Sequence, residues 1–133
     1  MEKLTKKQID AKASELSKKL DCKVTPAIVD NKDVGQVVGY FQEPSYDIIM
    51  YFMDAYQAGQ TSKSGDAALK DCLIESDSDP RITSNERKHS RIKASFAYAA
   101  TKFILPFTEE YNKMSEETKK KSEAASSSVQ KHS

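Results

Sequence analysis

The sequence predicts an α+β fold, with an N-terminal helix, a β-hairpin, and then a mainly helical bundle with a flexible C-terminal tail. The 133 residues, 38% of them hydrophobic, suffice for one core but not for two. Strand-type residues gather in two neighbouring stretches, and apolar residues elsewhere recur at helical spacing. We therefore expect a single α+β domain over residues 1–107, followed by a charged helix and a disordered tail over residues 108–133.

The chain opens with a predicted helix over residues 6–20. Thr5 stands at the N-cap and Gln8 follows three residues later, which is the spacing of a capping box. The apolar residues of this segment are few and share one narrow stripe: Ile9, Ala13, Leu16 and Leu20. We expect either an edge helix of the domain or an arm that docks on a neighbouring subunit.

Two stretches with strand character follow, at residues 23–30 and 34–42, and together they are rich in Val, Ile, Tyr and Phe. The polar cluster between them favours a turn, so we expect a β-hairpin. Pro26 cannot donate a ladder hydrogen bond, which places its strand at an edge or at a bulge. Because an isolated hairpin is only marginally stable in water, these strands must lie on the helices or pair with a partner's edge.

A second helix is predicted over residues 44–59, because Pro44 suits a first turn and Gly59 a C-terminal end. Its residues are apolar on nearly all sides, and one line remains for solvent: Asp47, Tyr51, Asp54 and Ala58. A helix this apolar requires burial over most of its surface, either inside this domain or against another copy or a client protein. The candidate interface residues are Tyr46, Ile49, Met50, Phe52 and Met53.

A polar loop over residues 60–65 and a short helix over residues 66–75 are expected next. Asp77 and Asp79 then stand close together, as they would in a calcium-binding loop. That pattern also needs a glutamate at its twelfth position, where counting from Asp77 finds Lys88. We therefore expect a turn at Asp79-Pro80 and no metal site.

The longest helix is expected to begin at Asn85, or at Ser84 before it, and to end at Leu105 because Pro106 follows. One face of this helix is apolar and consists of Ile92, Phe96, Ala99 and Phe103. A basic patch lies near its start and consists of Arg87, Lys88, Arg91 and Lys93. Beyond Pro106 the apolar content falls, so residues 108–121 predict a charged helix and residues from 122 onward predict disorder, or a tail that folds on a partner.

Charge is segregated along the chain. Residues 81–102 carry six Lys or Arg against Glu86 alone, whereas residues 43–79 carry eight Asp or Glu against two lysines. This complementarity would hold the helical parts of the domain together or orient one subunit on the next. A third possibility is that the basic patch binds nucleic acid. Nucleic acid is not the partner we expect, because the net charge is only +1 and no motif for base contact accompanies the basic patch.

The reactive residues do not predict an enzyme. The two histidines are His89, at a basic helix start, and His132, in the tail, and no glycine-rich phosphate loop is present. We expect no catalytic residue and no cofactor. Cys22 and Cys72 are expected to be free thiols or, alternatively, a disulfide. The sequence has no apolar run of membrane-spanning length, so we expect a cytosolic protein that does not use a membrane.

Three segments carry a resemblance to a known family. These are Val-Gly-Tyr-Phe-Gln-Glu-Pro at residues 38–44, Ala-Leu-Lys-Asp-Cys-Leu-Ile at 68–74, and Ser-Asp-Pro-Arg-Ile at 78–82. Together they resemble small proteins encoded among the structural genes of tailed bacteriophages, similar to tail-assembly chaperones. The resemblance covers roughly residues 23–105 and assigns no functional residue. It implies a β-hairpin paired with a helical bundle, self-association, and a non-catalytic role in coating the tape-measure protein during tail growth.

The expected function is therefore that of a non-enzymatic phage morphogenesis protein. It would bind a helical client or its own copies through the candidate interface residues, and its partners would be phage structural proteins. One alternative is a permanent virion component such as a capsid, neck or cargo protein. A second alternative is a small host-directed regulatory protein. The expected location is the host-cell cytoplasm during assembly, or the virion.

Overall fold

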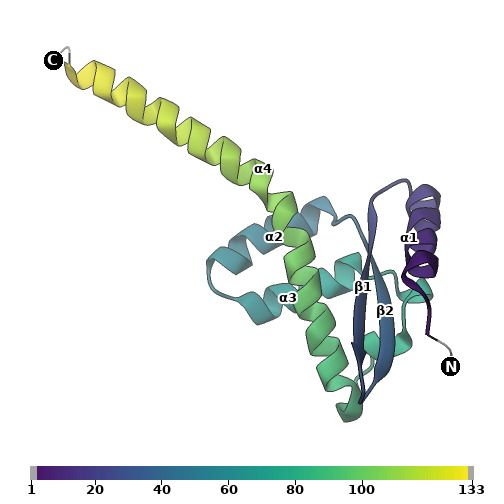
Figure 1. Cartoon of the computed structure of the whole chain (residues 1–133). Helices are drawn as coiled ribbons and strands as arrows, with labels where there is room; N and C mark the ends of the chain where they lie inside the picture. The colour runs from purple at the N-terminus through teal and green to yellow at the C-terminus, as the bar shows by residue number, and fades with distance from the viewer. Residues whose placement is uncertain (1–2, 132–133) are drawn as a thin grey trace.

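The computed structural model describes residues 3–131, with side chains described for all of these except 56, 57, 61, 110–113 and 115–131. The main elements, in chain order, are α1 (Lys6–Leu20), β1 (Val24–Asn31), β2 (Gly35–Gln42), α2 (Tyr46–Gln57), α3 (Thr61–Cys72) and α4 (Ser90–Lys131). Short 3₁₀ turns at Glu75–Asp77, Pro80–Ile82 and Arg87–His89 join α3 to α4. The predicted fold class, an N-terminal helix and a hairpin followed by helices, is confirmed (Figure 1).

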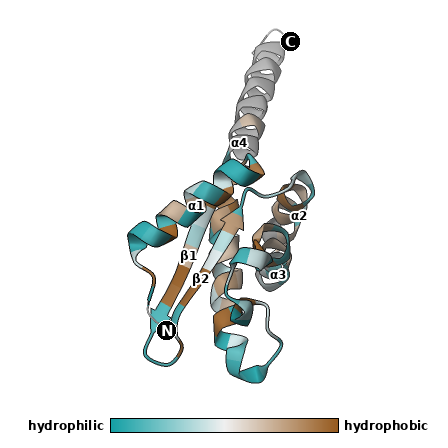
Figure 2. Cartoon of the chain, turned by 90° about the vertical axis from the view of Figure 1, so that its right-hand side faces the viewer, coloured by the Kyte–Doolittle hydropathy of each residue, from teal (hydrophilic) through white to brown (hydrophobic). Residues whose placement is uncertain are grey.

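The hairpin lies between two helical layers. Figure 1 shows α1 on one side of the strands and helices α2 to α4 on the other. Because side chains alternate along a strand, Val38 and Tyr40 of β2 pack against α1, whereas Val37 and Phe41 join the core shared with the helical bundle. Residues 37–41 of β2 are consequently all buried, and Figure 2 shows the apolar character of the strands behind α1.

The hairpin is antiparallel and in register from Val24 opposite Gln42 to Asn31 opposite Gly35. At its turn, the Asn31 side-chain oxygen accepts hydrogen bonds from the backbone N–H groups of Asp33 and Val34, each 3.0 Å long. Gly35 adopts a φ of +70°, which favours glycine. The sheet contains β1 and β2 alone, so Pro26 lies in an edge strand as predicted.

The second edge of β2 is covered by the segment that follows α3. The backbone N–H of Ile74 donates to Tyr40 O at 2.9 Å, and that of Asp79 donates to Val38 O at 3.0 Å. The turn predicted at Asp79-Pro80 is confirmed, because the Asp79 side chain caps the 3₁₀ turn that begins at Pro80. This segment therefore extends the hairpin sideways and carries the chain to α4.

Helix α1 has the predicted capping box, in which Gln8 N donates to Thr5 Oγ1 at 3.2 Å and Thr5 N donates to Gln8 Oε1 at 2.8 Å. It docks on the outer face of the hairpin as an edge helix of the domain. Its contact is a small cluster of buried side chains separate from the main core: Ile9, Ala13, Leu16, Val38, Tyr40 and Ile74. The expectation of an edge helix is thus confirmed, and docking of α1 on a second subunit stays a prediction.

Helices α3 and α4 do not begin where they were predicted to begin. Helix α3 begins at Thr61, so the expected loop over residues 60–65 is mostly helical. A Cβ at position 65 would lie 3.2 Å from Thr101 Oγ1 of α4. Because Gly65 has no side chain, α3 and α4 can approach each other closely there. The first regular turn of α4 begins at Ser90, after the 3₁₀ turn, rather than at Asn85.

Pro106 does not end α4, contrary to the prediction, because the helix continues to Lys131. A proline inside a helix removes one backbone hydrogen bond and usually kinks the axis. Here Phe103 and Phe107 pack across the proline with ring centroids 5.4 Å apart, and the Thr108 hydroxyl donates to Leu105 O at 2.7 Å. Figure 1 shows that α4 changes direction and extends beyond the body of the domain. The expected disorder from residue 122 stays a prediction, since the side chains there lie outside the described residues.

Candidate protein-binding surface

The start of α2 is fixed by one serine and one aspartate. Ser45 precedes the helix, and its Oγ accepts a hydrogen bond from Ile48 N at 3.3 Å, as an N-cap side chain does. The carboxylate of Asp71, near the end of α3, accepts hydrogen bonds from Ser45 N at 3.0 Å and from Ser45 Oγ at 2.6 Å. These contacts tie the first turn of α2 to α3 and set which side of α2 faces the core.

The buried side of α2 is formed by Ile48, Phe52, Met53 and Ala55. The opposite strip, predicted to face solvent, is exposed at all four positions: Asp47, Tyr51, Asp54 and Ala58. The sequence therefore predicted correctly which line of the helix faces water.

The five candidate interface residues do not lie on one surface. Tyr46 is 74% exposed and Met50 is 40% exposed, and Ile49 is half-buried. Phe52 and Met53 are buried, with exposed fractions of 1% and 8%, so a partner could reach them only if the core opened. The sequence could not separate these groups, because a helix that is apolar on nearly all sides gives no direction to the core.

The exposed side of α2 combines large apolar side chains with carboxylates. We call this surface the α2 face, defined by Tyr46, Asp47, Met50, Tyr51 and Asp54. Tyr51 was expected only as part of the solvated strip, yet it adds a second exposed aromatic ring to the face.

The two carboxylates of the α2 face, Asp47 and Asp54, are available to pair with cations of a partner. Among the residues with described side chains, five ion pairs form: Lys3–Asp30, Lys12–Asp77, Arg81–Asp79, His89–Glu86 and Arg91–Asp33. Neither Asp47 nor Asp54 takes part in any of them. The α2 face is therefore apolar and acidic, and its two carboxylates can pair with a partner's cations.

The basic patch is partly engaged within the chain. Arg91 pairs with Asp33 at the hairpin turn at 3.2 Å, and Lys93 Nζ donates to Asn85 Oδ1 at 3.0 Å. Arg87 and Lys88 are exposed. Within the described side chains, the one ion pair that joins the acidic segment 43–79 to the basic segment 81–102 is Arg81–Asp79, between near neighbours in sequence. The segregated charges thus do little to hold the helical parts of this domain together.

The two cysteines are free thiols. Cys72 is fully buried, and its pKa is raised to about 12 by this burial and by the neighbouring Asp71 carboxylate. A thiol with so high a pKa is almost entirely protonated at neutral pH and is a poor nucleophile. Cys72 therefore acts as a small apolar side chain of the core.

Two other kinds of site are absent from the part of the chain whose side chains are described. No group of three or more His, Cys, Asp or Glu residues is placed there to hold a metal ion. Within the same part, none of the helices is both long enough and apolar enough to cross a membrane.

Comparisons of the chain with protein-family models, with curated proteins and with solved structures found no match.

Proposed function

We propose that this chain is a non-enzymatic phage morphogenesis protein, of the tail-assembly-chaperone kind, that binds a helical client through the α2 face. The observation that carries the proposal is the exposure of Tyr46 and Met50 one helical turn apart on α2. The observed order of a hairpin followed by a helical bundle agrees with the fold implied by the resemblance. The proposed location is the host-cell cytoplasm during assembly.

The chemistry of the α2 face suits a helical partner. Side chains at positions i and i+4 form a ridge that packs into the groove of another helix. Tyrosine offers a large, rigid contact surface, and methionine adapts its shape to irregular partners. Asp54 continues this ridge by one more turn and Asp47 lies beside it, so the best client is a helix with an apolar stripe bordered by Lys or Arg.

The proposal is tested by capture from lysates of the cells that produce the protein. The variant carries Tyr46→Glu together with Met50→Glu, two exposed positions whose substitution should leave the core intact. The matched control is Lys7→Glu, which reverses an exposed charge on the outer layer formed by α1. Circular dichroism and urea unfolding establish that all three proteins are folded.

The wild type and the Lys7→Glu control should retain the same client, a protein rich in long helices. The double variant should retain at least about tenfold less of it, because a few central contacts, tyrosine among the most frequent, carry most of an interface's binding energy. The proposal is wrong if the folded double variant retains the same proteins in the same amounts as the wild type.

A permanent virion component would use the same kind of surface, so a second measurement separates the two roles. Mass spectrometry can quantify the chain in purified mature particles and in lysates, each normalised to a major structural protein. A chaperone is abundant in the lysate and nearly absent from particles. A fixed copy number in particles would instead identify a structural part of the virion.

A further inference from the structure

The two outer edges of the hairpin differ in how their backbone groups are used. The outer edge of β2 is covered by the segment that follows α3. Tyr40 N donates to Ser78 Oγ at 3.0 Å, and Tyr40 O accepts from Ile74 N at 2.9 Å. On the same edge, the Arg81 guanidinium donates to Gln36 O at 3.1 Å. The outer edge of β2 therefore has no room for another strand.

The outer edge of β1 has no such cover. Glu43 N donates to Lys23 O at 2.9 Å, and in the observed register this bond fixes which residues of β1 bond to β2. In an antiparallel ladder, the backbone groups of alternate residues point toward the neighbouring strand and those between them point away. The residues of β1 whose backbone groups point away from β2 are Val24, Pro26, Ile28 and Asp30. Within the described part of the chain, these groups form no hydrogen bond, so they are free to pair with an added strand.

A groove lies beside this edge, between α1 and the start of β1. It has a volume of about 510 Å³, and Figure 2 shows α1 lying across the strands. The α1 wall of the groove is one face of the helix, formed by Asp10, Ala13, Ser14, Ser17 and Lys18. From Asp10 to Lys18 the helix rises about 12 Å, which is the length of about four residues of extended chain. The groove therefore has the length of a short strand.

The middle of the groove is lined by small side chains. Ala13 and Ser14 form the α1 wall there, opposite Val24 of β1. The Ser17 hydroxyl donates to Cys22 O at 2.6 Å, so its proton is already used within the chain. This part of the groove offers space and apolar contact to a side chain of moderate size.

The two ends of the groove differ in charge. Lys18 and Lys23 line the end where α1 leads into β1, and Asp10 lines the other end. None of these three residues takes part in an ion pair among the described side chains. Residues 18–23 contain three lysines against Asp21 alone. The end of the groove at Lys18 therefore suits a carboxylate.

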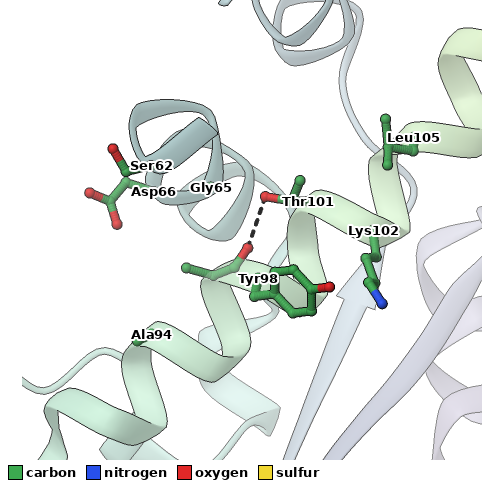
Figure 3. A pocket seen from close by; sticks show the side chains of 9 residues that line it. Ser62, Gly65, Asp66, Ala94, Tyr98, Thr101, Lys102 and Leu105 are labelled. Atoms are coloured by element: carbon green, nitrogen blue, oxygen red, sulfur yellow. Dashed lines mark hydrogen bonds between the residues drawn. The ribbon is translucent and has the colours of Figure 1, made fainter. Parts of the chain in front are cut away.

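The groove between α3 and α4, shown in Figure 3, is of a different kind. There the Thr101 hydroxyl donates to Ala97 O at 3.1 Å, the hydrogen bond drawn in the figure. Helices satisfy their backbone groups within their own turns, so an incoming chain would find only side chains to pair with. Ala94 is an exposed lining residue of this second groove and provides a position for a control substitution.

We propose that β1 binds an extended segment of a partner protein, which adds to the hairpin as a third, antiparallel strand. The backbone of the segment pairs with the outward groups of β1, and every second side chain enters the groove. A Val, Ile or Thr lies beside Ala13 and Ser14, and two residues later an Asp or Glu lies beside Lys18. This site is separate from the α2 face, so the inference goes beyond the proposed function and does not depend on it.

Selection from a library of short random peptides displayed on yeast tests the inference with the full chain as bait. Ile28→Pro removes an outward N–H and leaves the ladder between β1 and β2 intact, as Pro26 already does. Ile28→Thr is its matched control, because it changes the same half-exposed side chain and keeps the N–H. Lys18→Glu reverses the charge at the end of the groove. Its matched control is Lys19→Glu, in the same helical turn but outside the groove lining.

Peptides selected on the wild type should carry Val, Ile or Thr at every second position and end this pattern with Asp or Glu. Ile28→Pro should weaken their binding at least about tenfold, whereas Ile28→Thr should change it by less than about threefold. Circular dichroism establishes that both variants are folded. The inference is overturned if no peptide is selected above background, or if the selected peptides bind folded Ile28→Pro as well as they bind the wild type.

The charge variants test how the peptide is oriented. Lys18→Glu should weaken binding of the selected peptides at least about threefold, and Lys19→Glu and Ala94→Glu should leave it nearly unchanged. A selected peptide whose acidic residue is replaced by Lys should bind Lys18→Glu better than it binds the wild type. Equal effects of Lys18→Glu and Lys19→Glu would contradict the placement of the acidic residue.

Amide hydrogen exchange, measured by NMR on the wild type, locates the peptide even if Ile28→Pro does not fold. In the free chain the Ile28 N–H should exchange much faster than the N–H groups of Ala27 and Val29, which bond to β2. A saturating selected peptide should slow exchange at Ile28 at least about tenfold. A bound peptide that leaves the exchange of Ile28 unchanged lies elsewhere, and this result also overturns the inference.

Discussion

Met50 and Met53 lie three residues apart on α2, yet Met50 is 40% exposed whereas Met53 is 8% exposed. The contacts of Ser45 with Asp71 hold the start of α2 in the orientation that produces this difference. One turn of α2 therefore contributes one methionine to the core and another to a surface that a partner can reach. The two thioethers report separately on whether the core is intact and whether the α2 face is covered.

The link between Ser45 and Asp71 should be measurable in stability. Ser45→Ala removes the acceptor for Ile48 N and one donor to Asp71, so it should lower the free energy of unfolding by about 1–2 kcal/mol. Ser62→Ala is the matched control, since Ser62 is an exposed serine of α3, and it should change stability by less than about 0.5 kcal/mol. Urea unfolding measures both. Equal effects of the two substitutions would show that Ser45 does not anchor α2.

Gly39 should not tolerate a side chain. A Cβ at this position of β2 would lie 2.9 Å from Ile82 Cδ1 and 2.9 Å from Phe96 Cε1. Gly39→Ala should therefore destabilise the fold by about 1–3 kcal/mol, the usual cost of overpacking a core. Adding Ile82→Val removes one of the two clashing atoms and should make the Gly39→Ala substitution less costly than in the wild-type background. A Gly39→Ala protein as stable as the wild type would contradict this packing.

Arg81 should couple stability to acid. Its guanidinium donates to Val34 O at 2.8 Å and to Gln36 O at 3.1 Å, and it pairs with Asp79 at 2.7 Å. Hydrogen bonding to Arg81 lowers the pKa of Asp79 below its usual 3.8. The ionised carboxylate thus stabilises the fold above about pH 4, and this contribution is lost as the pH falls through the lowered pKa.

Arg81→Met should cost about 2 kcal/mol at neutral pH. It should also flatten the decline of stability below about pH 4, because the pKa of Asp79 then returns toward its unfolded value. The control is Arg91→Met, which breaks the exposed pair with Asp33 and should stay within about 1 kcal/mol of the wild type. Urea unfolding from pH 2 to pH 7 would measure both effects; an acid limb as steep as that of the wild type would argue against the role of Arg81.

The Tyr40 hydroxyl is buried without a hydrogen-bond partner among the described residues. Burial and the carboxylates of Asp77 and Asp10 raise the pKa of Tyr40 above 10. Tyr40→Phe removes an unsatisfied polar atom, so stability at neutral pH should stay unchanged or rise by up to about 1 kcal/mol.

The same pKa shift gives Tyr40→Phe an effect in alkali. The wild type should lose stability as the pH rises through about 10 toward the raised pKa, because ionisation is easier in the unfolded chain, and the variant should lack this contribution. Urea unfolding at pH 7 and at about pH 11 measures both effects. A loss of more than about 1 kcal/mol at pH 7 would mean that the hydroxyl has a partner after all.

The elements that the sequence predicted well are those set by local chemistry. The hairpin was predicted to within one residue, because its turn depends on Asn31 and its neighbours. The capping box of α1 likewise involves residues three apart. Both features can be read without knowing what lies elsewhere in the fold.

The errors arose where distant residues decide. Gly65 resembles a loop residue until Ala97 and Thr101 of α4 are placed beside it. Pro106 resembles a helix end, although packing of Phe103 on Phe107 carries the helix past it. The candidate surface was predicted only in part, again because distant residues decide which side chains are exposed. The apolar helix was found from its sequence, but which of its side chains face the core depends on where α3 and α4 lie.

The most direct test of the α2 face is methionine oxidation by hydrogen peroxide, read at each site by mass spectrometry. The purified free chain is compared with complexes isolated natively from producing cells. In the free chain Met50 and Met114 should oxidise readily and Met53 slowly, following their exposure. In the complexes the rate at Met50 should fall at least about tenfold while Met53 stays slow and Met114 marks the rate of an exposed site. Oxidation of Met50 at the same rate in both samples would contradict the account, because the α2 face would then be uncovered in the working assembly.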